Sequence, residues 1–171
     1  QNFNTIYQLY ADKKSGRLQN AKYFLMMPEY LSFKLTGVCK NEYTNATTTG
    51  LVNAKDKAWD SDIISALGLP SELFATLNTP SSVVGDFSEN IQKAVGFNST
   101  VLFAPSHDTA SAVCACPMAD NDLYISSGTW SLIGTEITEP ILNDNARQLN
   151  FTNEGGIDYR FRFLKNYMGM W

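Results

Sequence analysis

The residue types best suited to catalysis stand together at His107, Asp108 and Thr109. A short apolar run, residues 101–104, precedes them, and a segment rich in small residues, 108–116, follows. This order predicts a strand buried on both faces and then a tightly packed helix, which places Asp108 where open α/β sheets bind ligands. The helix dipole favours an ionised Asp108, whose carboxylate can accept a hydroxyl proton. Simple capping of the helix by Asp108 is the alternative interpretation, with His107 as a structural, hydrogen-bonded residue.

The segment Ser126-Ser127-Gly128-Thr129 has the composition of a tight polar turn. It divides residues 123–135 into two predicted β-segments that meet at Gly128. Backbone amides and hydroxyl groups in such a turn can face phosphate oxygens, although an ordinary hairpin turn has the same composition. The sequence has neither a Gly-x-x-x-x-Gly-Lys-Ser motif nor a Gly-x-Gly-x-x-Gly motif, which excludes a P-loop within this span.

Polar and basic residues gather again toward the end of the sequence. The pattern predicts a strand around residues 159–163 and then a helix that runs to Trp171 without a stop signal, as if the chain had been cut there. We expect Arg160 and Arg162 to lie on an ordinary solvated helix face. Asn166 differs because its neighbours are apolar, and an amide in such surroundings can bind a hydroxylated ligand.

Short helices and connections are predicted for the rest of the chain. Residues 21–36 have the apolar spacing of a buried helix, with a break at Pro28 and Gly37 in the stop position. A threonine-rich segment, residues 41–49, is too polar and too β-branched to extend that helix, and it predicts a surface or cleft-lining loop. Further helices are predicted at residues 60–67, 71–77 and 88–95.

The composition indicates a folded chain with enough apolar side chain for a core. Of the 171 residues, 44% are hydrophobic and 12% aromatic. The net charge of −4 argues against a nucleic-acid partner. There is no membrane-length apolar run and no signal-peptide pattern, so we expect a cytoplasmic protein with no membrane partner. The three cysteines lack the spacing of a metal site, which predicts reduced, buried thiols and no side-chain metal site.

Taken in order, these segments resemble the FGGY family of carbohydrate kinases over nearly the whole chain. Several ordered motifs are far more specific than one. His-Asp-Thr-Ala-Ser together with Ser-Gly-Thr-Trp resembles the members that phosphorylate L-rhamnulose rather than those that act on glycerol or xylulose. The stretches that carry the resemblance are residues 2–9, 24–31 with 35–37, 41–49, 106–113, 126–132 and 152–156 with 163–166.

The resemblance implies an α/β fold, as a fragment of the actin-like pair of ribonuclease-H-like domains that sugar kinases share with Hsp70 and actin. Residues 1–117 would form the C-terminal part of the first kinase domain, and residues 118–171 would begin the second, with the active site in the cleft between the domains. Complete family members are much longer, so the first phosphate loop and the adenosine-binding glycine motif would lie in missing portions of the kinase chain. We therefore expect this chain alone to be inactive.

The same resemblance implies roles in the transfer of phosphate from ATP, with Mg²⁺, to a ketose. Asp108 matches the base that accepts the proton of the sugar hydroxyl during in-line attack on the γ-phosphate. The residues that match sugar contacts are His107, Thr109 and Asn166, and those that match the nucleotide-phosphate turn are Gly128 and Thr129.

The acceptor that the resemblance implies is L-rhamnulose, with its 1-hydroxyl as the nucleophile. Two alternatives stay open. Another ketose, such as L-fuculose, would need only one or two different contacts. A non-catalytic actin-like module could bind a sugar or a protein partner, but such a module has no need to keep Asp108 together with Thr129.

Overall fold

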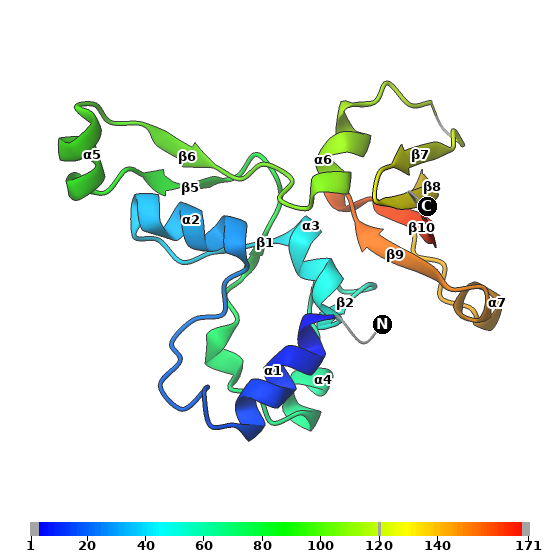
Figure 1. The fold of residues 1–171 in the computed structure, drawn as a ribbon, viewed down its shortest axis with the longest axis horizontal. Coiled ribbons are helices and arrows are strands. Elements are labelled where there is room, and N and C mark those ends of the chain that lie inside the picture. Colours follow the sequence, from blue (N-terminus) through cyan, green and yellow to red (C-terminus); the bar gives the residue numbers. More distant parts are fainter. Residues whose placement is uncertain (1–3, 120, 169–171) are drawn as a thin grey trace.

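The computed structural model describes residues 4–119 and 121–168. Short helices and two-stranded ribbons make up the N-terminal part, and a four-stranded sheet makes up the C-terminal part (Figure 1). The predicted α/β class is therefore confirmed. In order, the elements are α1 (Thr5–Lys14), α2 (Met27–Thr36), β1 (Asn41–Glu42), α3 (Tyr43–Ala46), η1 (Thr47–Thr49), β2 (Val52–Asn53), β3 (Ala58–Trp59), α4 (Ser61–Ala66), η2 (Ser71–Leu73), β4 (Leu77–Asn78), β5 (Val83–Asp86), α5 (Glu89–Val95), β6 (Thr100–Leu102), α6 (Asp108–Ala115), β7 (Tyr124–Ser127), β8 (Trp130–Ile137), α7 (Asp144–Gln148), β9 (Phe151–Gly155), η3 (Ile157–Tyr159) and β10 (Phe161–Met168).

Helices α1 and α4 enclose a small apolar core, in the lower part of Figure 1. Leu9, Leu51, Ile64 and Leu69 are buried there. Helix α4 begins after Asp60, whose carboxylate accepts a hydrogen bond of 2.9 Å from an amide in the first turn. This cap satisfies an amide that has no partner within the helix. The helix predicted at this position is confirmed.

Helix α2 ends where the sequence predicts but begins later. Gly37 follows its last turn with a φ of 77°, a left-handed conformation that glycine adopts without strain. Residues 21–26 are not helical. Pro28 lies in the first turn of α2, where its missing amide hydrogen costs no hydrogen bond. The predicted break is therefore the start of the helix.

The segment 41–49 is not the predicted loop, because it forms β1, α3 and η1 in succession. Its predicted place at a cleft is confirmed, since Asn45, Thr47 and Thr48 line a cavity. Tyr43, Thr44 and Thr49 in it are fully buried. Three successive threonine hydroxyls donate to the carbonyl oxygen three residues earlier, at 2.8, 2.8 and 2.6 Å. These local bonds satisfy the hydroxyls, which allows polar β-branched residues to occupy buried helical turns.

The helix predicted at residues 71–77 is also wrong. Only the turn η2 forms there, and β4 follows as a strand parallel to β1. The Ala75 amide donates to the side-chain oxygen of Asn41 at 3.1 Å, which holds the chain extended between η2 and β4. A partner 34 residues away therefore overrides the local helical pattern.

The apolar run at residues 101–104 is not a strand buried on both faces. Strand β6 pairs with β5 in an antiparallel ribbon, and Leu102 is 55% exposed. Phe103, directly after the strand, is buried. An apolar run indicates a strand but does not determine how many strands or layers will cover it.

The C-terminal sheet has the strand order β7-β8-β10-β9, and all its neighbours are antiparallel. Strands β7 and β8 confirm the two predicted β-segments that meet at Gly128. The helix predicted after residue 163 is wrong, because β10 continues as a strand through residue 168. Eight residues of β10 pair with β8, and these ladder bonds keep the segment extended. Residues 169–171 of the predicted helix lie outside the described residues.

Helix α6 packs directly on this sheet through Val113, which forms one buried cluster with Tyr124 and Leu164. Gly134, which lies between Tyr124 and Leu164 in the sheet, leaves room for both, because a Cβ atom there would lie 2.7 Å from the Leu164 Cβ and 2.8 Å from the Tyr124 hydroxyl. Cys114 and Cys116, at the end of α6, are exposed and Cys39 is half-buried, so the predicted burial of the thiols is wrong.

The predicted domain division, 1–117 and 118–171, falls between α6 and β7. It stays a prediction. None of the described helices is both long and apolar enough to cross a lipid bilayer.

Candidate active site

A cavity of about 730 Å³ lies between the N-terminus of α6, the turn after β7 and strand β10. Its size is in the range of small-molecule sites, about 300–1,000 Å³. All six residues that the sequence selected line this one cavity although they span 60 positions of the chain: His107, Asp108, Thr109, Gly128, Thr129 and Asn166. The arrangement brings together a carboxylate, hydroxyls, an imidazole and an amide.

Asp108 is the first residue of α6, and its side chain is 97% exposed to the cavity and solvent. One carboxylate oxygen, Oδ1, accepts from the Thr109 amide at 2.6 Å and from the Thr109 hydroxyl at 3.2 Å. The capping position belongs to His107, which makes no side-chain capping bond. The other carboxylate oxygen of Asp108 accepts no hydrogen bond from the described residues, so it is open to a ligand.

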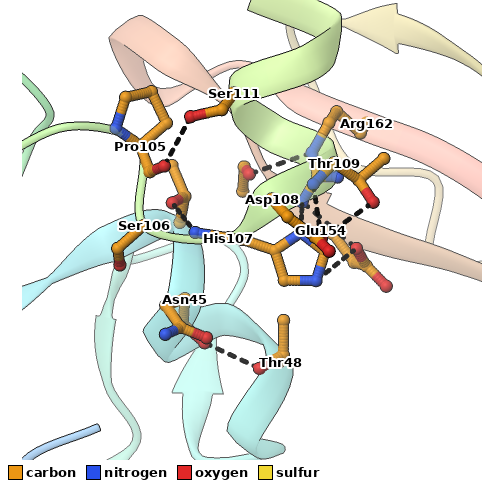
Figure 2. A network of polar contacts seen from close by, with 12 residues as sticks. Asn45, Thr48, Pro105, Ser106, His107, Asp108, Thr109, Ser111, Glu154 and Arg162 are labelled. Carbon is orange, nitrogen blue, oxygen red and sulfur yellow. Dashed lines mark hydrogen bonds and ion pairs between the residues drawn. The ribbon is translucent and has the colours of Figure 1, made fainter. Parts of the chain in front are cut away.

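His107 lies beside Asp108 and contacts two charged residues of the sheet, as Figure 2 shows. Its Nδ1 is 3.3 Å from Nη2 of Arg162, and its Nε2 is 4.0 Å from a carboxylate oxygen of Glu154. Burial and the Arg162 guanidinium lower the pKa of His107, against the opposing effect of nearby carboxylates. A guanidinium can only donate, so Nδ1 accepts and the hydrogen of the neutral ring is on Nε2.

Arg162 is fully buried in β10, which corrects the prediction of a solvated helix face. Its Nη2 donates to Glu154 at 3.1 Å and its Nε donates to the Gly155 carbonyl at 3.2 Å. A buried guanidinium needs such partners, because an unpaired charge in the interior is costly. Sequence reasoning missed Arg162 and Glu154 as parts of the site. The available signal was the position of Arg162 between two phenylalanines in a strand pattern.

The turn at Ser126-Ser127-Gly128-Thr129 has few internal contacts. Its Gly128 amide donates to the Trp130 carbonyl at 3.1 Å. A Cβ atom at Gly128 would meet only that carbonyl oxygen, at 3.6 Å, so open space surrounds this position. The three hydroxyls of the turn form no hydrogen bond with the described residues. Free hydroxyls beside open backbone suit the oxygens of a phosphate group.

Asn166 lies in β10 opposite Leu132, in the half-buried part of the sheet. Its predicted helical setting is wrong, but the strand still brings its side chain to the same cavity as Asp108. An amide offers both a donor and an acceptor, which suits a hydroxyl group of a ligand.

The carboxylates in the cavity lining are Asp108 and Glu154, and Glu154 is paired with Arg162. The described residues contain no group of three His, Cys, Asp or Glu side chains able to hold a metal ion. Asp108 is the carboxylate of this lining with an oxygen that could meet a metal ion, directly or through water.

Curated relatives match the whole length of the chain. It is 53% identical over 173 residues to a rhamnulokinase of Oceanobacillus iheyensis and 53% identical to a rhamnulokinase of Halalkalibacterium halodurans. A rhamnulokinase of Mannheimia succiniciproducens is 45% identical. The match covers 100% of the chain but 37% of each of the first two relatives, and 99% of the chain and 34% of the third. The chain thus spans little more than a third of the length of these relatives.

Solved structures share the fold at low sequence identity. A xylulose kinase from Lactobacillus acidophilus superposes with a TM-score of 0.83 at 20% identity, over 96% of this chain and 34% of that one. A Plasmodium falciparum glycerol kinase with ADP superposes with a TM-score of 0.75 at 13% identity, over 96% and 34%. Residues 2–115 match the model of the FGGY family of carbohydrate kinases, N-terminal domain. On this match, the chain belongs to the FGGY family of carbohydrate kinases.

Proposed function

We propose that these residues form part of the active site of a kinase that transfers the γ-phosphate of ATP to a ketose, most specifically the 1-hydroxyl of L-rhamnulose. The observation that carries the proposal is the shared cavity, in which an open carboxylate of Asp108 lies opposite a turn with free hydroxyls. The rhamnulokinase names of the relatives support the choice of sugar. The activity is proposed for the whole protein, of which this chain supplies the residues that line this cavity.

In this proposal Asp108 is the general base. Its unbonded carboxylate oxygen takes the proton of the sugar hydroxyl as the hydroxyl oxygen forms a bond to the γ-phosphorus. The bond from that phosphorus to the β–γ bridging oxygen breaks, and ADP leaves with the electron pair. Positioning and neutralisation of charge supply most of the rate in such transfers, and the base orients the nucleophile.

The other cavity residues bind and orient the two substrates. The Nε2 hydrogen of neutral His107 donates to a sugar oxygen, and Asn166 contacts a second sugar hydroxyl from the opposite side. Thr109 completes the sugar contacts and, by bonding Oδ1 of Asp108, keeps the second oxygen turned toward the sugar. Gly128 and Thr129 hold phosphate oxygens of the nucleotide.

Mg²⁺, when bound with ATP, would neutralise charge on the phosphates. The residue of this chain best placed to meet it, directly or through water, is Asp108, because Glu154 already pairs with Arg162. The cytoplasmic location predicted from the sequence remains part of the proposal.

The test of the base is Asp108→Asn in the full-length protein that carries these residues. Asparagine keeps the shape but loses the base, so we expect kcat to fall by about 10²–10⁴-fold while sugar binding, measured by calorimetry, is retained. Asp62→Asn is the matched control, because Asp62 also lies in the first turn of a helix but outside the cavity. Unchanged turnover of the Asp108 variant would reject the assigned role.

The test of the acceptor is a panel of ketoses with the wild-type full-length protein. We expect the highest kcat/KM with L-rhamnulose and a lower value with L-fuculose. A higher kcat/KM with L-fuculose would identify L-fuculose as the acceptor in the same phosphoryl transfer. Absence of nucleotide binding would instead favour a non-catalytic, sugar-binding module.

A further inference from the structure

Glu42 is a carboxylate with 0% exposure that takes no part in the proposed chemistry. It ends β1 and caps the short helix α3, accepting from the Thr44 amide at 2.8 Å and the Asn45 amide at 3.2 Å. The Thr44 hydroxyl also donates to it, at 2.6 Å. Capping of α3 needs only the two amide bonds, so the further bonds that Glu42 accepts do something else.

Glu42 also binds a second segment of the chain. Its Oε2 accepts from the Ser106 amide at 3.1 Å and from the Ser106 hydroxyl at 2.6 Å, 64 residues away in sequence. Ser106 directly precedes His107 and Asp108. A charged acceptor makes shorter and stronger hydrogen bonds than a neutral one, so this carboxylate fastens the loop before α6 tightly.

The Thr44 hydroxyl extends the connection by one residue. It donates to Glu42 and accepts from the His107 amide at 3.3 Å. The backbone of residues 106–107 is therefore held at two successive amides, one by the carboxylate and one through the threonine. We call these contacts, from Glu42 and Thr44 to residues 106–107, the clamp. Asp108 is the next residue after it.

We propose that Glu42 is a positioning residue that sets the location of His107 and Asp108 relative to the sugar. It acts through Ser106 and Thr44 and does not line the cavity itself. The inference rests on the proposed kinase function. Because a displacement of about 1 Å in a reacting group can cost about 100-fold in rate, the clamp contributes to turnover and not only to folding.

Glu29 provides a matched control within the same interior. It is a second buried carboxylate, 1% exposed, and it accepts from the amides of Met26 and Glu42 and from the side chain of Asn41, at 2.7, 2.8 and 2.7 Å. These bonds fasten α2 to β1, including the Glu42 amide, and none of them is made to residues 106–108 directly. The two carboxylates therefore share burial and side-chain type but differ in which segments they bind.

The experiment compares Glu42→Gln with Glu29→Gln in the full-length protein. In either orientation, the side-chain amide introduced by Glu42→Gln would turn its NH₂ group toward a backbone amide hydrogen. For Glu42→Gln we expect kcat about 100-fold lower and a several-fold higher KM for L-rhamnulose, with an unchanged KM for ATP. For Glu29→Gln we expect a fall in Tm, with kcat within about threefold of wild type per folded molecule.

The KM for sugar separates positioning from folding. Partial unfolding lowers kcat per total protein but leaves both KM values unchanged. A displaced loop weakens sugar binding, because the loop ends at His107 and leads directly into Asp108 and Thr109 of α6. Equal kinetic effects of the two Gln variants, at matched folded fractions, would overturn the proposal.

Ser106→Ala provides a second comparison if Glu42→Gln does not fold. It removes only the 2.6 Å bond from the loop to the carboxylate, and we expect roughly tenfold lower kcat with a raised sugar KM and little change in Tm. Ser82→Ala is its control, because Ser82 donates one bond of 2.6 Å away from the cavity. A Ser106→Ala variant with the kinetics of the Ser82 variant would also reject the role.

Failure of this inference is distinct from failure of the proposed function. If the wild-type protein phosphorylates the ketose and Asp108→Asn does not, the kinase assignment holds whatever the Glu42 variants show. If the wild-type protein transfers no phosphate to any ketose, the proposed function itself fails.

Discussion

The two walls of the cavity are built in opposite ways. The wall at residues 106–109 is tied to the interior by the carboxylate of Glu42 below it and by Arg162 beside it. The wall at residues 126–129 is exposed from Ser127 onward, and beyond the pairing of β7 with β8 its turn has one backbone hydrogen bond, from Gly128 to Trp130. We infer that the protein fixes the proposed base and the proposed sugar contacts before substrates bind, whereas the proposed phosphate turn would gain its partners from the nucleotide.

Arg162→Met tests the firm wall with the largest expected effect. The change leaves the mostly buried carboxylate of Glu154 without its partner, so we expect the free energy of unfolding to fall by about 3 kcal/mol, measured by urea denaturation of the full-length protein. The double variant Arg162→Met with Glu154→Gln should regain part of this loss, because it removes the unpaired charge. A loss below about 0.5 kcal/mol in the single variant would contradict the buried pairing.

Thr44→Val tests the same wall, and we expect a smaller loss of stability than for Arg162→Met. Valine keeps the shape of Thr44 but leaves the His107 amide without an acceptor, so we expect a loss of about 1–3 kcal/mol together with lower kcat. Thr49→Val is the control, because the Thr49 hydroxyl is also buried and makes two bonds, yet neither bond reaches residues 106–108. Both variants should lose stability, and only Thr44→Val should lose turnover. Similar kcat values for the two would count against the clamp.

The pKa of His107 predicts a pH dependence of stability. The groups that face the ring are Arg162, Glu154, Asp108 and Glu42. Since the folded state lowers this pKa below its ordinary value of 6.5, the unfolded chain binds more protons below that pH. The stability gained by keeping His107 neutral is therefore fully present above about pH 6.5. It is lost as the pH falls toward and through the pKa that His107 has in the folded state.

The measurement compares unfolding free energies of wild type and His107→Asn between pH 5 and 7.5. Asparagine does not titrate, so the wild type should lose more stability than the variant on acidification. Parallel curves would show that His107 is not held neutral. The comparison removes the contribution of all other titrating groups that the two proteins share.

Thr129→Val tests the open wall, and we expect the smallest effect on stability. The side chain is exposed and bonds to no described residue, so the free energy of unfolding should change by less than about 0.5 kcal/mol. The KM for ATP should rise roughly tenfold, because one hydrogen bond to a charged phosphate is lost. Thr129→Ser keeps the hydroxyl and should restore the wild-type value. A large loss of stability in Thr129→Val, with an unchanged KM for ATP, would contradict the view that this wall is held loosely until nucleotide binds.

The predictions that succeeded depend on strong local signals. Gly37 ends α2 in the left-handed conformation, the helix predicted at residues 88–95 forms as α5, and the pattern around Gly128 forms two paired strands. The predictions that failed depend on distant partners. Residues 71–77 become extended under a bond from Asn41, and β10 stays a strand because β8 and β9 pair with it on both sides.

The sequence by itself determined which residue types could act and in what order they occur, because motif chemistry and helix caps depend on near neighbours. The tertiary structure alone decided that residues from 107 to 166 meet at one cavity, and that Arg162 is buried beside His107 instead of exposed. Only the tertiary structure brought Glu42 to Ser106, across 64 residues. The reason is physical: a buried charge is stable only where donors or opposite charges surround it, and here those partners come from distant parts of the chain.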